Sequence, residues 1–330
     1  MLSQSLAQAV LEEALSTGGD FAELFMEDRR NNVLQYLSGH VESVNSGRLH
    51  GAGIRVYTGY NAVYVYTNDT GEAGLLKCAR QAAAAVLGKT RSAHAQAIHA
   101  VQPVNIHPIA ISPSQAEAKR KVEVLRAADA AARACGNEIS QVTGVLTDSD
   151  QDVLICNSDG LYVQDRRVYT RLACTAVASS GSENQTGSDA PGAMMGFELF
   201  QNRVDPQRVG KIAGDMAVTM LHAPTCPAGV MPVCIDNGFG GVIFHEACGH
   251  ALEATAVALG SSVFCGKLGQ QIASEKVTAI DDGTLPNEWG SENVDDEGRP
   301  TTKLVLIENG ILKNYMLDTL NGRKTVMQLT

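Results

Sequence analysis

The sequence has little positive charge and no long uncharged apolar run. Its 26 lysines and arginines stand against 36 aspartates and glutamates, which gives a net charge of −10 at pH 7. A nucleic-acid-binding surface needs a basic footprint, so we expect no nucleic-acid partner. The longest apolar run, residues 238–260, is interrupted by two histidines and two glutamates. These groups argue against a membrane-spanning helix, and we expect no membrane partner.

Paired cysteines and an export signal are also missing. Eight cysteines are scattered along the chain, and none forms a Cys-x-x-Cys pair. Several lie in apolar runs, as Cys156 does, which is typical of free thiols in a reducing compartment. Residues 1–6 lack a basic region followed by an apolar core, so we expect no signal peptide. Together these features predict a cytoplasmic protein.

One stretch concentrates chemically active side chains. Residues 244–253 read Phe-His-Glu-Ala-Cys-Gly-His-Ala-Leu-Glu, so His245, Glu246 and His250 lie within six positions of an otherwise apolar run. Burying such groups is costly unless they are paired or bound to a metal. Neutral imidazole is the commonest protein ligand for zinc, and an adjacent glutamate can accept a proton from water on the metal. The cluster therefore predicts metal or acid–base chemistry.

The spacing of the two histidines imposes a geometric condition. The zinc-protease motif His-Glu-x-x-His places its histidines at i and i+4 on one helix face. His245 and His250 stand at i and i+5, which a regular helix separates by about 140°. Both imidazoles reach one ion only if the helix bulges, is overwound or ends near Gly249, where glycine permits such a departure. We expect that departure.

Two other interpretations of this region remain open. In the first, the helix is buried and its histidines only form hydrogen bonds with neighbouring strands. In the second, the glycine-rich residues 237–241 bind a phosphate between a strand and a helix. However, neither a complete dinucleotide fingerprint nor a following Gly-Lys-Ser/Thr is present. The glycines are also explained by a tight turn from a strand into the helix.

The expected fold class is α+β, and residues 1–223 predict an N-terminal domain of helices packed on an antiparallel sheet. Apolar periodicity and capping residues predict helices at 2–16, 71–88, 112–135 and 205–221. Alternating patterns and turn residues predict strands at 21–28, 33–37, 40–44, 53–58, 62–66, 139–147, 151–156, 161–169 and 172–179. The polar, glycine-rich residues 181–192 predict a mobile loop.

The segment Pro224-Thr225-Cys226-Pro227 marks the expected domain boundary. Residues 224–330 predict a mostly β C-terminal domain that carries the His-Glu helix, with strands at 229–235, 277–280, 304–307 and 311–316. The acidic residues 295–298 lack the calcium-loop pattern and predict a surface turn. Because this domain contains one obvious helix and few strands, we expect the sequence to be a fragment of a longer protein.

The motif at residues 245–253 resembles the signature of the TldD branch of the TldD/PmbA proteins, which are also called modulators of DNA gyrase. Further blocks match in order and spacing across about residues 230–325. They are Ser262–Phe264, Gly266–Gly269, Asp281–Thr284, Asp295–Gly298, Leu306–Leu312 and Leu320–Arg323. The N-terminal two thirds of the chain agrees with the family in general pattern.

The resemblance implies a zinc metallopeptidase that hydrolyses unfolded or extended peptides as a heterodimer with a PmbA-type (TldE) subunit. It implies that His245 and His250 bind Zn2+ and that Glu246 is the general base. The family's third protein ligand is a cysteine in a Cys-Gly-Lys stretch near the C-terminus, which we expect beyond residue 330. Cys265 also precedes Gly-Lys, but by order it aligns with a non-ligand position. We therefore expect an incomplete site that binds zinc weakly.

A rival interpretation belongs to a different class of protein. The chain would be a non-catalytic scaffold that binds peptides or a partner subunit, and its histidines would be structural. Metal content discriminates between the two, because only the enzyme requires stoichiometric zinc.

Overall fold

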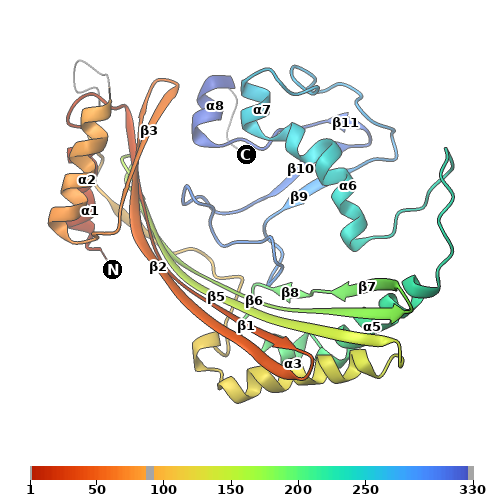
Figure 1. Ribbon diagram of the computed structural model, residues 1–330. Coiled ribbons are helices and arrows are strands. Elements are labelled where there is room, and N and C mark those ends of the chain that lie inside the picture. Colours follow the sequence, from red (N-terminus) through yellow and green to blue (C-terminus); the bar gives the residue numbers. More distant parts are fainter. Residues whose placement is uncertain (1, 87–92, 326–330) are drawn as a thin grey trace.

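The computed structural model describes residues 2–86 and 93–325, and in these residues one long sheet, antiparallel except where β4 pairs with β6, dominates the chain (Figure 1). Its strands lie in the order β3-β2-β1-β5-β6-β4, and β7 and β8 also pair with β6. The strands are β1 (Phe21–Leu37), β2 (His40–Thr58), β3 (Asn61–Thr67), β4 (His99–Val101), β5 (Ile139–Asn157), β6 (Leu161–Ser180), β7 (Glu183–Asp189) and β8 (Gly192–Ala193).

The central strands are longer than the sequence pattern predicts. β1 pairs with β5 without interruption from Glu23↔Asn157 to Leu37↔Thr143. The expected breaks at residues 29–32 and 148–150 are therefore wrong. Ser38 and Gly39 form the turn between β1 and β2 with φ values of 48° and 89°, as a two-residue hairpin requires.

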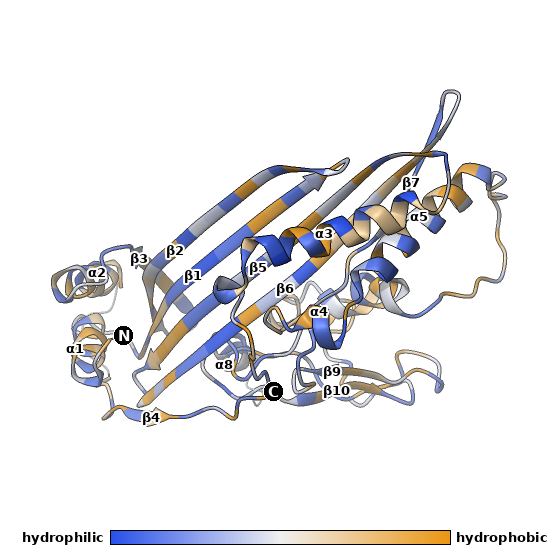
Figure 2. Ribbon diagram, turned by 90° about the horizontal axis from the view of Figure 1, so that it is seen from below, coloured by the Kyte–Doolittle hydropathy of each residue, from blue (hydrophilic) through white to orange (hydrophobic). Residues whose placement is uncertain are grey.

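Helices cover the two ends of the convex face of the sheet, and none of the described helices packs on the middle of that face. Helices α1 (Gln4–Ala14) and α2 (Glu72–Ala85) cover one end of the convex face, and α3 (Ala118–Arg133) and α5 (Pro206–His222) cover the other. Figure 2 shows the hydrophilic band of strand residues between them. That band explains the misplaced breaks, because charged side chains such as Arg30 and Asp150, which face each other on β1 and β5, lie in the middle of their strands.

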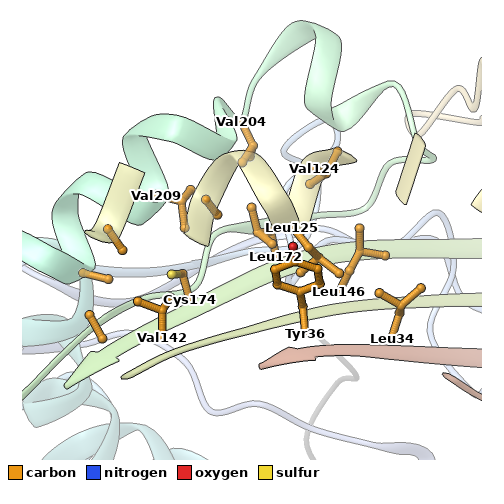
Figure 3. Packing of buried hydrophobic residues seen from close by; sticks show 14 of the residues in the cluster. Leu34, Tyr36, Val124, Leu125, Val142, Leu146, Leu172, Cys174, Val204 and Val209 are labelled. Carbon is orange, nitrogen blue, oxygen red and sulfur yellow. The ribbon is translucent and has the colours of Figure 1, made fainter. Parts of the chain in front are cut away.

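Two separate hydrophobic cores result from this arrangement. In one core, Leu24, Ile54 and Leu154 pack under α1 and α2. In the other, Leu34, Leu146 and Leu172 pack under α3 and α5, together with α4 (Leu199–Asn202) (Figure 3). Each of β1 and β5 supplies residues to both cores.

Two local expectations in this part are wrong. The helix expected from residue 112 begins only at Ala118, after a 3₁₀ turn at Pro113–Gln115. The Ser112 hydroxyl binds Asp150 instead of capping the helix. The expected loop at 181–192 contains β7, which lies against α5. A Cβ on Gly187 would lie 2.3 Å from the Ala213 carbonyl oxygen, so glycine there permits close packing and is no sign of a loop.

The remaining residues form a smaller unit on the concave side of the sheet (Figure 1). Its strands β9 (Ala279–Asp282), β10 (Lys303–Glu308) and β11 (Ile311–Leu312) form a three-stranded sheet. Its helices are α6 (Val242–Phe244), α7 (Ala254–Ala258) and α8 (Thr319–Thr325). Leu252, Leu306 and Tyr315 belong to its core. The expected strand at 229–235 is wrong, because these residues run exposed and unpaired.

The α+β fold class is confirmed by these elements. The division into domains 1–223 and 224–330 remains a prediction. None of the described helices is long and apolar enough to cross a membrane.

Candidate metal centre

The helical segment that carries the two histidines is not a regular α-helix. After α6 the chain forms a π-helical turn over His245–Gly249 and then a 3₁₀ turn over His250–Leu252. The backbone N–H of His250 donates to the carbonyl of His245. This i→i+5 hydrogen bond places the two residues one above the other. The departure from regular winding expected near Gly249 is therefore confirmed.

The π-helical turn brings the two imidazole rings together. Their centroids lie 4.3 Å apart at an interplanar angle of 63°. One ligand atom from each of His245, Glu246 and His250 lies within 4.8 Å of the others. The Nε2 atom of His250 lies 4.0 Å from Oε2 of Glu246. The three predicted site residues thus form one cluster, and among the described residues no other group of this kind gathers.

Glu253 fixes the orientation of one ring. Its Oε1 lies 2.7 Å from Nδ1 of His250, so Nε2 is the nitrogen of His250 that faces the cluster. Metal-ligating histidines usually donate their second ring N–H to a carboxylate or carbonyl, which sets the tautomer. Glu253 lies outside the ligand set predicted from the sequence. The His-x-x-Glu spacing, one helical turn, could have indicated it.

The cluster lies on the surface and not in a core. The side chains of Glu246 and His250 are 66% and 53% exposed. The interpretation of a buried helix with histidines bonded to neighbouring strands is therefore wrong. Beneath the cluster, fully buried Leu252 anchors the turn in the small core, and its carbonyl accepts a hydrogen bond from the backbone N–H of Met316 at 3.0 Å.

The donor set fits a zinc ion in part. Two imidazoles and a carboxylate are typical zinc ligands or proton acceptors. Neither nearby thiol joins the cluster, since Cys248 and Cys265 lie outside the group. The Sγ atom of Cys265 lies 3.5 Å from the carbonyl oxygen of Val257. The nucleotide interpretation lacks its strand, because the residues before the 3₁₀ turn Gly238–Gly241 are unpaired.

A cavity of about 460 Å³ adjoins the cluster through Glu253. Its walls include Leu304 and Met316 and several carboxylates, among them Asp281, Glu292 and Asp295. Burial raises the pKa of Glu292 and of Asp295. The cavity therefore offers both apolar and acidic surface next to Glu253.

Comparison with known proteins finds matches to one family along most of the chain. Residues 22–86, 111–221 and 228–330 match the models for domain 1, the central domain and the C-terminal domain of the PmbA/TldA metallopeptidases. A metalloprotease TldD homologue from Haemophilus influenzae is 32% identical over 310 residues, which is 92% of this chain. The chain spans 64% of the length of that relative.

Solved structures share the fold. A candidate modulator of DNA gyrase from Bacteroides thetaiotaomicron superimposes with a TM-score of 0.79 at 17% identity, over 99% of this chain and 74% of that one. TldE from Thermococcus kodakarensis gives a TM-score of 0.74 at 20% identity, over 98% and 72% respectively.

Proposed function

Because the chain belongs to the PmbA/TldD family of metallopeptidases, we propose that it is a TldD-type, zinc-dependent peptidase subunit. It cleaves unfolded or extended peptides together with a PmbA/TldE-like partner. The observation that carries this proposal is the π-helical turn, which gathers His245, Glu246 and His250 within 4.8 Å.

In this proposal the two histidines bind the metal, and Glu253 orients the ring of His250. His250 binds through Nε2, because its Nδ1 is engaged by Glu253 at 2.7 Å. His245 binds from the preceding turn of the same segment. Catalytic zinc has three protein ligands and a water molecule, so a third ligand has to come from outside this cluster.

When bound, zinc supplies Lewis acidity, which polarises the peptide carbonyl and lowers the pKa of water. Glu246 is the general base, since its carboxylate is exposed and lies 4.0 Å from Nε2 of His250. It accepts a proton from the attacking water and returns it to the amine as the C–N bond breaks. The same carboxylate thus serves both proton transfers.

The partner, the compartment and the substrate class rest on three further observations. The likeness of fold to TldE supports a partner built on the same plan. Eight unpaired cysteines support a reducing compartment such as the cytoplasm. The cavity beside Glu253 supports a polymeric substrate, since it extends the site beyond the three residues.

The test is Glu246→Gln in the protein together with its partner subunit. Peptide cleavage should fall by about a hundredfold to ten-thousandfold, the usual contribution of a general base, while zinc content and partner binding stay unchanged. Glu275→Gln, an exposed carboxylate in the same unit, is the matched control. Undiminished cleavage by Glu246→Gln would exclude the assigned role.

The rival function is a scaffold that binds peptides or a partner without catalysis. The exposed position of the cluster would suit a contact surface as well as an active site. A wild-type protein that lacks stoichiometric zinc and whose partner binding is insensitive to chelators would favour the scaffold.

A further inference from the structure

One arginine of the long sheet is shared by two carboxylates from different parts of the chain. Nη2 of Arg55 in β2 lies 2.5 Å from Oε1 of Glu23 and 3.3 Å from Oε1 of Glu297. Glu23 is 6% exposed, and the side chain of Glu297 is 12% exposed. Removal of the guanidinium would leave two shielded carboxylates facing each other, which is strongly unfavourable.

Glu297 connects this arginine to α8. Its Oε2 accepts hydrogen bonds from the backbone N–H of Thr319 at 3.0 Å and from the Thr319 hydroxyl at 2.5 Å. Figure 1 shows α8 beside the end of the long sheet where β2 and β3 lie. Arg323 adds a second contact there, with Nη1 2.7 Å from Oδ1 of Asp20.

The segment that leads into α8 also contacts the residues next to the candidate metal centre. Met316 pairs with Glu253 in a parallel bridge, and its N–H donates to the carbonyl of Leu252 at 3.0 Å. Within α8, Asn321 donates to the hydroxyl of Thr255 at 3.3 Å. Residues before and after Glu253 in the chain are therefore hydrogen-bonded to residues 316–321.

We infer that Arg55 is a positioning residue for the candidate metal centre. Through Glu297 it fixes the start of α8, and residues 316–321 in turn hold Glu253 against Nδ1 of His250. Arg55 touches neither the histidines nor Glu246. Its role is to keep the small unit seated on the sheet so that the ring of His250 stays oriented. The inference deepens the proposed function and rests on it.

The experiment measures zinc binding and backbone exchange in the whole protein. Zn2+ alone is titrated against a chromophoric chelator, and amide hydrogen exchange is followed over residues 250–258. Arg55→Met and Glu297→Gln should each weaken zinc binding by about threefold to thirtyfold and speed exchange in this segment. Both substitutions break the same contact between Arg55 and Glu297. The double variant should therefore bind zinc no more weakly than the weaker-binding single variant.

Arg48→Met is the matched control. Arg48 lies on the same strand and donates two hydrogen bonds to Asp28, a residue of the sheet itself. This variant should keep wild-type zinc affinity and exchange rates. Circular dichroism establishes that each variant is folded, and Glu297→Gln carries the test if Arg55→Met does not fold.

Two negative results can be told apart. If wild type binds no zinc, the proposed function fails, and the exchange rates over 250–258 still test the positioning role. If folded Arg55→Met and Glu297→Gln match wild type in both zinc affinity and exchange, the positioning role is overturned while the proposed function stands.

Discussion

Nδ1 of His250 lies 2.7 Å from Oε1 of Glu253, one helical turn further along the chain. This contact assigns the two ring nitrogens different tasks, because Nδ1 is held by the carboxylate and Nε2 faces Glu246. It also makes the orientation of the ring depend on a residue outside the predicted ligand set.

Glu253→Ala should therefore lower zinc affinity by about tenfold to a hundredfold, the usual effect of removing a carboxylate behind a histidine ligand. Glu253→Gln should have a smaller effect, since its amide oxygen still accepts the Nδ1–H bond. Isothermal titration with zinc measures both. Glu308→Ala, an exposed carboxylate paired with Lys313 at 3.1 Å, is the control. An affinity that Glu253→Ala leaves unchanged would contradict the orienting role.

Substitutions of Gly249 should depend on side-chain size. A Cβ at this position would lie 3.4 Å from Nδ1 of His245, an ordinary contact, and the backbone φ of −54° suits any residue. Gly249→Ala should therefore keep zinc affinity. Gly249→Val adds two branches toward the ring, so it should displace His245 and weaken binding. Equal affinities for the two variants would show that the ring is not confined there.

The stability of the fold should fall with rising pH because of Glu23. Burial raises the pKa of Glu23 from 4.5 to about 7, although Arg55 opposes this. The folded chain then binds the proton more tightly than the unfolded chain, so the free energy of unfolding decreases between about pH 4.5 and pH 7. At about 1.4 kcal/mol per pKa unit the loss is about 3 kcal/mol.

Glu23→Gln stays uncharged and should lack this decrease. Urea denaturation at pH 5 and pH 8 compares it with wild type and with Glu275→Gln as the control. A decrease of the same size in Glu23→Gln and wild type would assign the pH dependence to other groups.

Close packing of α3 and α5 should make Gly210 intolerant of a side chain. A Cβ there would lie 2.0 Å from the carbonyl oxygen of Ala128 in α3, and backbone cannot move aside cheaply. Gly210→Ala should lower the free energy of unfolding by about 1–3 kcal/mol. Gly47→Ala, with no heavy atom within 4 Å, should change it little. Thermal denaturation of both variants measures the difference. Equal midpoints would contradict the expected intolerance of Gly210 to a side chain.

Local signals in the sequence located most helices and the cluster itself. The Asp205 cap is an example, since its side chain accepts a hydrogen bond from the backbone N–H of Gln207 at 3.0 Å, as the Asp-Pro start predicts. The requirement for a distorted turn near Gly249 could also be derived, because i, i+5 spacing is incompatible with a regular helix carrying a shared ion.

Other features depend on tertiary contacts that no local pattern encodes. The glycine in β7 gives a loop signal in the sequence, because its packing against α5 at Gly187 is a long-range contact. The apolar residues of 229–235 suggest a strand, but in the described structure no neighbour pairs with them. The link from Arg55 to Glu297 joins residues 242 positions apart, so spacing in the sequence gives no sign of it.

The long strands also bear on how the molecule comes apart. Leu24 and Leu34 of β1 belong to different cores, as do Leu154 and Leu146 of β5. Neither end of the sheet can detach as a rigid body, since the same strands run through both. If the strands separate at one end of the sheet, the core at the opposite end can stay folded on the same strands. Partial unfolding of this protein should therefore follow the length of its strands and ignore boundaries drawn between segments of sequence.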